Sequence, residues 1–193
     1  MPKRLFLGTM LKAEQAELLG KLKDQIEPLL TEWWHCKLRF VRPEKLHTTC
    51  LFLGDCDETE EADILSLMSD EIPKLKSCTL HYDRLSFFGS SARPNAMVLL
   101  PSHVPDEMKT IGRTVRTLLS GFCKNKENLE FRPHLTIFRF PKEHRRRYEL
   151  KEPLNLTAYL PLVQEIKQIS LIESHLGSQA ADYEIIAEFK LRD

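Results

Sequence analysis

Two copies of a short motif place a histidine and a threonine two residues apart, a combination suited to acid–base chemistry at phosphorus. The first copy is His47 with Thr49, and the second is His134 with Thr136. Side chains at positions i and i+2 of a β-strand point to the same face. Histidine, with an unperturbed pKa of about 6.5, gives and takes protons near neutral pH, and a threonine hydroxyl donates to phosphate oxygens. If both copies line one cleft, they supply a general base and a general acid on opposite sides of one phosphorus atom.

Arg139 is the nearest cation on the second of these strands, and its charge would offset that of a phosphate and of the developing transition state. It lies five residues after His134, an odd offset that strict alternation places on the opposite face of the strand. Arg139 therefore joins the site only if the strand bends or bulges. Phe52 has the same offset from His47. We expect Phe52 either to stack on a base of the substrate or to pack in the core.

The elements that must position these motifs are strands and helices in a mixed order. Alternating apolar residues and turn residues predict strands over 3–8, 38–41, 46–53, 77–88, 95–100, 165–175 and 182–191, with another inside 129–140. Helical spacing predicts helices over 11–30 and 105–121, and a shorter helix that begins at Asp57 or Thr59. This order indicates an α+β domain with mostly antiparallel sheets. Each His-x-Thr motif follows one of the long helices, which predicts two similar halves that each contribute one such strand.

The charge balance excludes a protein that binds nucleic acid through a large overall excess of basic residues. Lysine plus arginine and aspartate plus glutamate each number 28, so the formal net charge is zero. The balance is a sum of opposed runs, because residues 55–71 are rich in acids and residues 131–147 are rich in lysine and arginine. The basic run includes Lys142 and Arg145–Arg147 and surrounds the second histidine, where a phosphate-bearing substrate would need it.

Cysteine usage and hydropathy give expectations about location and cofactors. The five cysteines are scattered and form no C-x-x-C pair, which favours reduced thiols and a cytoplasmic location. The sequence contains no stretch of about 18 apolar residues, so we expect no membrane partner. No Cys/His spacing fits structural zinc, and the glycines form neither of the common nucleotide-binding loops.

The residues around both motifs resemble a known family. Residues 42–54 and 131–139 are similar to the two signatures of the 2H phosphoesterases, and most similar to those of the LigT-like RNA 2',3'-cyclic phosphodiesterases, historically called 2'-5' RNA ligases. The opening strand, residues 171–177 and the closing strand also resemble that family, so the likeness covers nearly the whole chain. The resemblance implies a single bilobal, pseudo-twofold α+β domain over 1–193, with two mostly antiparallel sheets around a central cleft and helices outside.

The same resemblance implies an activity. Family members hydrolyse a terminal ribonucleoside 2',3'-cyclic phosphate to a 2'-phosphate without a metal or other cofactor, and some join or cleave 2'-5' linkages reversibly. The expected substrates are RNA ends or small cyclic nucleotides, and the expected state is a monomer. Carried onto this chain, His47 becomes the proton donor and His134 the proton acceptor. The expected phosphate contacts are those of Thr49, Thr136 and Arg139.

Several alternatives stay open from the sequence. A phosphodiesterase for 2'-5' oligonucleotides or for an ADP-ribose cyclic phosphate would use the same residues, and a non-catalytic RNA-binding module would keep the same cleft. The intact histidines, threonines and arginine favour an enzyme. Thr48 and Cys50 replace residues that are usually bulkier apolar or cationic ones in the family, and Phe138 stands where a small residue is common. We expect these departures to alter the substrate pocket.

Overall fold

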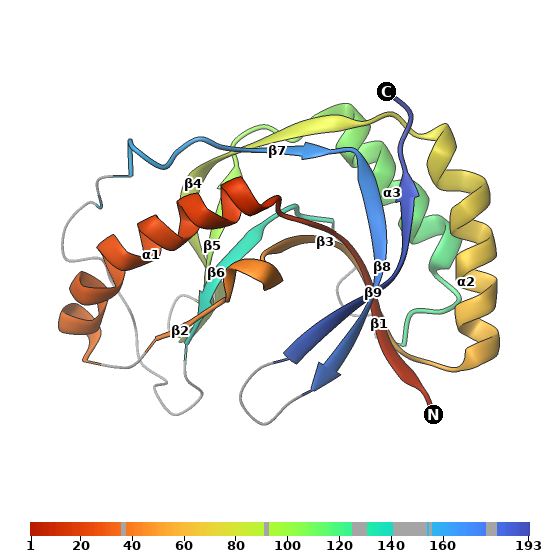
Figure 1. Cartoon of the computed structure of the whole chain (residues 1–193), viewed down its shortest axis with the longest axis horizontal. Helices are drawn as coiled ribbons and strands as arrows, with labels where there is room; N and C mark the ends of the chain where they lie inside the picture. The colour runs from red at the N-terminus through yellow and green to blue at the C-terminus, as the bar shows by residue number, and fades with distance from the viewer. Residues whose placement is uncertain (36–37, 91–92, 125–130, 141–153, 155, 177–180) are drawn as a thin grey trace.

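A single antiparallel sheet runs through the molecule in the computed structural model, which describes all residues except 36–37, 91–92, 125–130, 141–153, 155 and 177–180 (Figure 1). The strands found among the described residues are β1 (Lys3–Met10), β2 (Arg39–Phe40), β3 (His47–Cys56), β4 (Cys78–Ser90), β5 (Arg93–Pro101), β6 (Leu135–Arg139), β7 (Leu162–Ile166), β8 (Gln168–Leu176) and β9 (Ala181–Lys190). The helices are α1 (Ala13–Trp34), α2 (Glu58–Glu71) and α3 (Asp106–Leu119), with short 3-10 turns η1 (Pro43–Lys45) and η2 (Ile72–Lys74). None of these helices is long and apolar enough to cross a membrane.

The sheet consists of two arms that meet at one residue pair. Its strand order is β7-β4-β5-β6-β3-β1-β8-β9, with β2 paired to β6. We call β7, β4, β5, β6 and β2 the first arm, and β3, β1, β8 and β9 the second arm. Between them, β6 and β3 pair only through Thr48 opposite Leu135. The expected α+β class with antiparallel pairing is confirmed, and the two expected sheets are the two arms of one hydrogen-bonded sheet.

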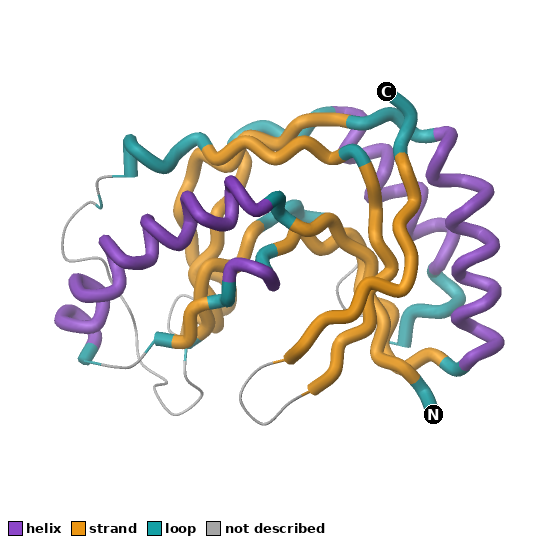
Figure 2. The backbone as a smooth tube through the Cα atoms, in the orientation of Figure 1, coloured by secondary structure: helices purple, strands orange, loops and turns teal. Residues whose placement is uncertain are grey.

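The helices lie outside the arms, and each long helix covers the arm that does not carry its own His-x-Thr strand. The helix α1 precedes β3 in the chain but runs along the first arm (Figure 2). There the Trp34 ring packs against those of Phe87 and Phe138 at 6.1 Å each. The helix α3 precedes β6 but contacts β3 of the second arm. Because each helix is amphipathic, it buries its apolar face against the arm that it covers. The two halves are therefore interleaved.

The chain crosses from one arm to the other at Lys167. The sequence predicts one strand over 165–175, but the structure has two, β7 and β8, which are separated at this residue. The strand β7 pairs with β4 in the first arm, whereas β8 pairs with β1 in the second. The single-strand prediction is wrong because the apolar pattern continues through the crossing, and only the pairing partners distinguish the two segments.

A buried polar network joins the arms behind the Thr48–Leu135 pair. Thr48 Oγ1 donates to Gln164 Oε1 at 2.7 Å and lies 2.5 Å from the hydroxyl of Tyr82. The Gln164 amide in turn donates to the backbone carbonyl of Thr9 at 3.3 Å. Thr48 and Thr9 belong to the second arm, while Tyr82 and Gln164 belong to the first. Since these polar groups are shielded from water, their mutual bonds hold the two arms in one relative position.

We expect Thr48→Val to destabilise the protein by about 1–3 kcal/mol. The substitution keeps the side-chain shape but removes one hydrogen bond from each of the buried Gln164 and Tyr82 oxygens. Urea unfolding followed by circular dichroism measures the change. The matched control is Thr117→Val on the exposed side of α3, which should stay within about 0.5 kcal/mol of the wild type. Equal stabilities of the two variants would show that the network does not hold the arms together.

Candidate functional site

Both His-x-Thr motifs lie on one face of the junction between β3 and β6. Thr48 and Leu135 stand opposite each other and are fully buried on the helix-covered side. Since neighbouring residues of a strand point to opposite faces, the residues on either side of this pair project to the other side of the sheet, which we call the open face. The side chains brought together there are those of His47, Thr49, His134 and Thr136, and all four are partly exposed.

The two histidines are oriented in the same way by the backbone. Nδ1 of His47 lies 2.7 Å from the carbonyl oxygen of Lys45, and Nδ1 of His134 lies 2.8 Å from that of Arg132. A carbonyl oxygen only accepts hydrogen bonds, so each Nδ1 carries the hydrogen. Nε2 is then the nitrogen of each ring that is left to take up or release a proton at the open face.

Aromatic rings shield both histidines from water. The His47 ring lies 5.0 Å from the Phe6 ring and 5.1 Å from the Tyr183 ring, whose plane is at 89° to its own. The His134 ring lies 4.5 Å from that of Phe88. Burial lowers the pKa of both histidines below the usual value of 6.5, and the backbone hydrogen bonds oppose this only in part. The charge of Arg139 lowers both pKa values further. The charge of His134 also lowers the pKa of His47.

The irregularity that Arg139 requires is present in β6. Thr136 pairs with Val98 and Phe138 pairs with Met97, so Ile137 is an extra residue in the strand. Ile137 and Phe138 are consequently both buried, and Arg139 returns to the open face and is exposed. Its charge acts on both histidine rings and on the Tyr183 hydroxyl. Arg139 therefore stands with the two histidines.

The same irregularity at the same offset brings Phe52 to the open face of β3. Leu51 pairs with Leu7 and Thr49 with Gly8, so Cys50 is the extra residue. Phe52 is 56% exposed, and its ring lies 5.4 Å from that of Phe6. Core packing, one of the two expectations for Phe52, is thus wrong, because the bulge turns this ring outward. Cys50 itself is buried, and burial raises the pKa of its thiol to about 12.

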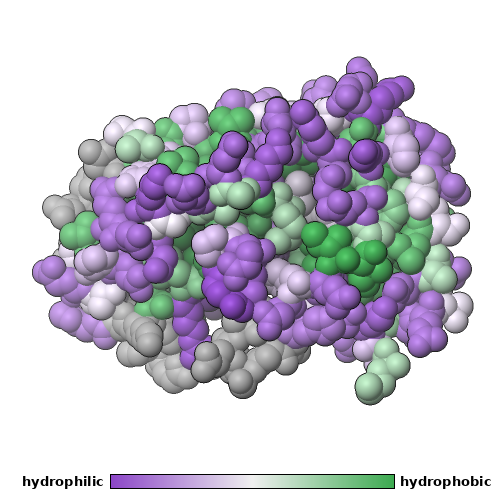
Figure 3. All heavy atoms as spheres, viewed as in Figure 1, coloured by the Kyte–Doolittle hydropathy of each residue, from purple (hydrophilic) through white to green (hydrophobic). Residues whose placement is uncertain are grey.

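Phe52 begins an apolar row across the open face of the second arm. Successive partners across the strands form this row, which consists of Phe52, Phe6, Ile172 and Ile185. Its two ends are the exposed ones, with Ile185 46% accessible. Figure 3 shows hydrophobic atoms gathered at the surface where β1, β8 and β9 cross. One wall of the site is therefore apolar, and the other carries Arg139.

Other aromatic and basic residues that could contact a nucleotide are engaged elsewhere or are not described. Trp34 is buried in the core between α1 and the first arm. Arg42 is engaged in ion pairs with Asp182 at 2.9 Å and with Glu44 at 3.4 Å. The basic residues Lys142 and Arg145–Arg147 lie outside the described residues.

Sequence reasoning missed Tyr183 and Phe88, the rings beside the two histidines. Both residues lie in segments whose sequence pattern predicts a strand. Nothing in their spacing indicates which strands run beside β1 and β6. It also missed Asp182, which forms an ion pair with Lys45, the residue whose carbonyl orients His47. These contacts depend on the return of β9 to the first motif, a tertiary relation that no local pattern encodes.

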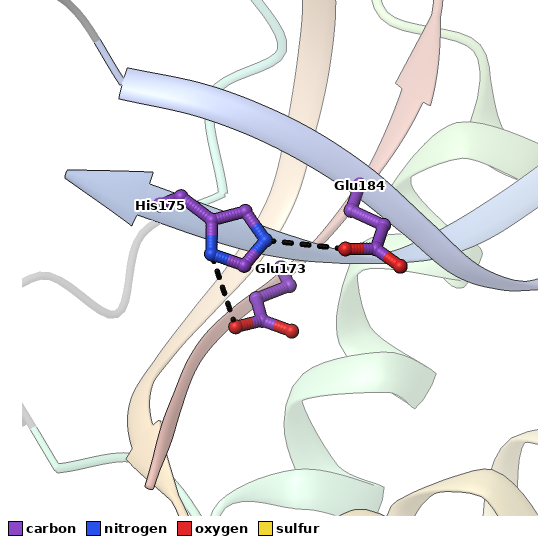
Figure 4. A group of neighbouring side chains, drawn as sticks. All are labelled: Glu173, His175 and Glu184. Atoms are coloured by element: carbon purple, nitrogen blue, oxygen red, sulfur yellow. Dashed lines mark hydrogen bonds and ion pairs between the residues drawn. The ribbon is translucent and has the colours of Figure 1, made fainter. Parts of the chain in front are cut away.

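Within the described part of the chain, the group of side chains that could hold a metal ion lies on the β8–β9 hairpin (Figure 4). Nδ1 of His175 is 3.3 Å from a Glu173 oxygen, and Nε2 is 3.2 Å from a Glu184 oxygen. The two ring nitrogens face different carboxylates, so these contacts among the three side chains hold the group together. Tyr183 precedes Glu184 on β9 and points to the opposite face, toward His47, so the group is separate from the candidate site.

Comparison with known proteins gives related sequences. Residues 11–98 match the family model described as LigT like Phosphoesterase. A protein of Aquifex aeolicus (strain VF5) named RNA 2',3'-cyclic phosphodiesterase is 25% identical over 192 residues, which cover 97% of each chain. A protein of Methanocaldococcus jannaschii with the same name is 27% identical over 193 residues, or 96% of this chain and 99% of the other.

Solved structures share the fold along the full length of the chain. Escherichia coli LigT complexed with 3'-AMP superposes with a TM-score of 0.81 at 19% identity, covering 100% of both chains. A Thermus thermophilus protein gives a TM-score of 0.75 at 20% identity, covering 98% of both chains. These likenesses concern the fold, and they confirm the expected LigT-like α+β architecture.

The lowered histidine pKa values predict a loss of stability in acid. An unfolded chain binds protons at histidine below a pH of about 6.5, whereas the folded chain resists protonation of His47 and His134 until lower pH. Their contribution is therefore fully present above pH 6.5 and is lost as the pH falls through the window below it. In a double variant, His47→Gln with His134→Gln, the free energy of unfolding should fall less between pH 7.5 and pH 5 than in the wild type.

Urea unfolding at several pH values measures this difference. The control is His81→Gln, at an exposed position on β4, which should keep the pH dependence of the wild type. If the double variant kept it too, the two site histidines would not be the groups that resist protonation.

Proposed function

We propose that this chain is a LigT-like phosphoesterase that opens a terminal ribonucleoside 2',3'-cyclic phosphate to give a 2'-phosphate. The relatives from Aquifex and Methanocaldococcus carry the name of this activity and match nearly the whole chain. The observation that carries the proposal is the gathering of two histidines, two threonines and one arginine on the open face of a single strand junction.

His134 acts as the general base in the proposed reaction. A water molecule attacks phosphorus opposite the 3'-oxygen, and Nε2 of His134 takes the proton that the water loses. The lowered pKa of His134 supports this role, because the ring is neutral and able to accept a proton near neutral pH. Its Nδ1 hydrogen stays bonded to the Arg132 carbonyl and supports the charged ring that forms.

His47 acts as the general acid. As the bond between phosphorus and the 3'-oxygen breaks, the protonated Nε2 of His47 delivers its proton to that oxygen and leaves a free 3'-hydroxyl. The lowered pKa of His47 makes its protonated form a stronger acid. The negative charge of a bound phosphate favours this protonated form, so substrate binding increases the protonated fraction of His47.

Thr49, Thr136 and Arg139 hold the phosphate. The two hydroxyls approach it from the two strands and donate to non-bridging oxygens. The guanidinium offsets the negative charge that grows on these oxygens when water attacks. Phe52, exposed beside Phe6 on the opposite arm, offers a flat apolar surface on which the base of the terminal nucleotide stacks. This arrangement fixes the cyclic phosphate between the two histidines.

Ligation would use the same groups in the same roles. If a 5'-hydroxyl of a second RNA replaces water, its oxygen bonds to phosphorus as the bond to the 3'-oxygen breaks, His134 takes the hydroxyl proton and His47 protonates the 3'-oxygen. A 2'-5' linkage would form in this way, and its cleavage back to the cyclic phosphate would exchange the roles of the two histidines. Such ligation stays a prediction for this chain, as do the cytoplasmic location and the monomeric state.

We expect His47→Ala and His134→Ala each to lower kcat on 2',3'-cyclic AMP by about 10²- to 10⁴-fold, because each removes one proton-transfer group. The double variant should lose little more than the worse single variant, since the two histidines act in one step. The control His81→Ala should keep the wild-type rate, and EDTA should change none of these rates. Full activity in either single variant would contradict the assigned roles.

The pH dependence of kcat/KM should be bell-shaped with its maximum below a pH of about 6.5. The rate rises with pH as His134 loses its proton and falls as His47 loses its own, and both pKa values lie below the usual 6.5. Since the bound phosphate raises both pKa values, the kcat profile should move to higher pH. A flat kcat/KM profile between about pH 5 and 9 would argue against two-histidine catalysis.

A further inference from the structure

A second arginine stands directly opposite Arg139. In the pairing of β2 with β6, Arg39 is the partner of Arg139, and Phe40 is the partner of Phe138. Side chains that are direct partners across antiparallel strands lie on the same face, with Cβ atoms about 4.5–5.5 Å apart. Arg39 lies outside both His-x-Thr motifs and the residues 42–54 and 131–139 that surround them.

The neighbouring pair establishes which face the two arginines occupy. The Phe40 and Phe138 rings lie 5.0 Å apart, Phe138 is fully buried, and Lys23 of α1 lies over the Phe40 ring at 5.7 Å. These two phenylalanines therefore face α1. Arg39 and Arg139 alternate with them and project to the open face, where both are exposed.

Neither arginine has a carboxylate partner among the described residues, although most cations nearby do. Arg42 pairs with Asp182 and Glu44, and Lys45 also pairs with Asp182. Two like charges that face each other across a strand pair destabilise the sheet. A bound anion reverses the sign of this interaction, because each guanidinium then gains a phosphate oxygen as a charge-assisted acceptor.

We propose that Arg39 binds the phosphodiester group next to the reacting cyclic phosphate, and that the site therefore favours an oligoribonucleotide end over a mononucleotide. This inference rests on the proposed function for the location of the cyclic phosphate. On the open face, Arg139 lies at the far end of β6 from His134. Arg39 lies opposite Arg139 on the edge strand β2. An RNA bound along this line contacts Arg39 with its last phosphodiester group. Its terminal cyclic phosphate then lies at Arg139 and the two histidines.

The position of β2 fits a track for a continuing chain. It pairs with β6 alone and has no further strand beyond it in the described sheet. An arginine at such an edge contacts the backbone of a nucleic acid without reading its sequence. Each contact of this kind adds to the affinity for a polynucleotide and to its salt dependence, and it leaves a ligand with a single phosphate unaffected.

The test compares Arg39→Gln with the wild type on two substrates that end in the same ring, 2',3'-cyclic AMP and a ten-nucleotide RNA with a terminal 2',3'-cyclic phosphate. For the RNA, kcat/KM should fall about 5- to 20-fold because KM rises. The slope of log KM against log salt concentration should decrease by about 0.7. For 2',3'-cyclic AMP, kcat/KM should stay within about twofold. Arg39→Lys should restore part of the loss, because it keeps the charge but not the planar fork.

The matched control is Arg113→Gln, which removes an exposed arginine from α3 on the helix-covered side and should change neither substrate. Equal losses on both substrates, or no loss on either, would overturn the role of Arg39. Failure of the proposed function is recognised separately, because the wild type would then open neither ring. In that case, fluorescence anisotropy with a ten-nucleotide 3'-phosphorylated RNA decides the matter. Weaker binding by Arg39→Gln supports the second phosphate contact, and equal binding overturns it.

Discussion

The whole arrangement depends on one antiparallel residue pair, Thr48 opposite Leu135, where the two arms of the sheet meet. A slip of this pairing by one residue would leave one His-x-Thr motif on the open face and turn the other to the helix-covered side. The buried bonds from Thr48 to Tyr82 and Gln164 secure the pairing from behind. They lie on the opposite side of the sheet from the reacting groups, so the junction can be rigid without occupying the site. Thr48 supplies the hydroxyl that reaches the other arm.

The two halves repeat the same local design and differ in one side chain that gives the site a direction. Each His-x-Thr motif is followed by an extra strand residue three positions after its histidine, Cys50 in β3 and Ile137 in β6. Both bulges return the residue at the fifth position to the open face. That residue is Phe52 on one side and Arg139 on the other. An apolar wall therefore faces a cationic wall, which suits a nucleotide whose base and phosphates need opposite surroundings.

Much of the fold and of the candidate site could be predicted from local sequence patterns. The other features depend on contacts between segments that are far apart in the sequence. Spacing predicted the two motif strands, the long helices and the start of α2 at Asp57 or Thr59. In the structure, Asp57 is the cap and forms the full capping box. It also stated the condition under which Arg139 reaches the site, and the bulge meets it. No local signal predicted the break between β7 and β8, the ring of Tyr183 beside His47, or the partnership of Arg39 with Arg139. Each of these follows from strand neighbours that are far apart in the sequence.

The central claim, that His47 and His134 share one phosphate, is tested most directly by NMR of the histidine rings. The Cε1–H resonances are assigned with His47→Gln and His134→Gln and then followed while adenosine 2'-phosphate, the product of the proposed reaction, is added. The account predicts that both resonances shift with the same dissociation constant and that both ring pKa values rise in the complex. A response from only one of the two rings, or from neither at a saturating concentration, would contradict it.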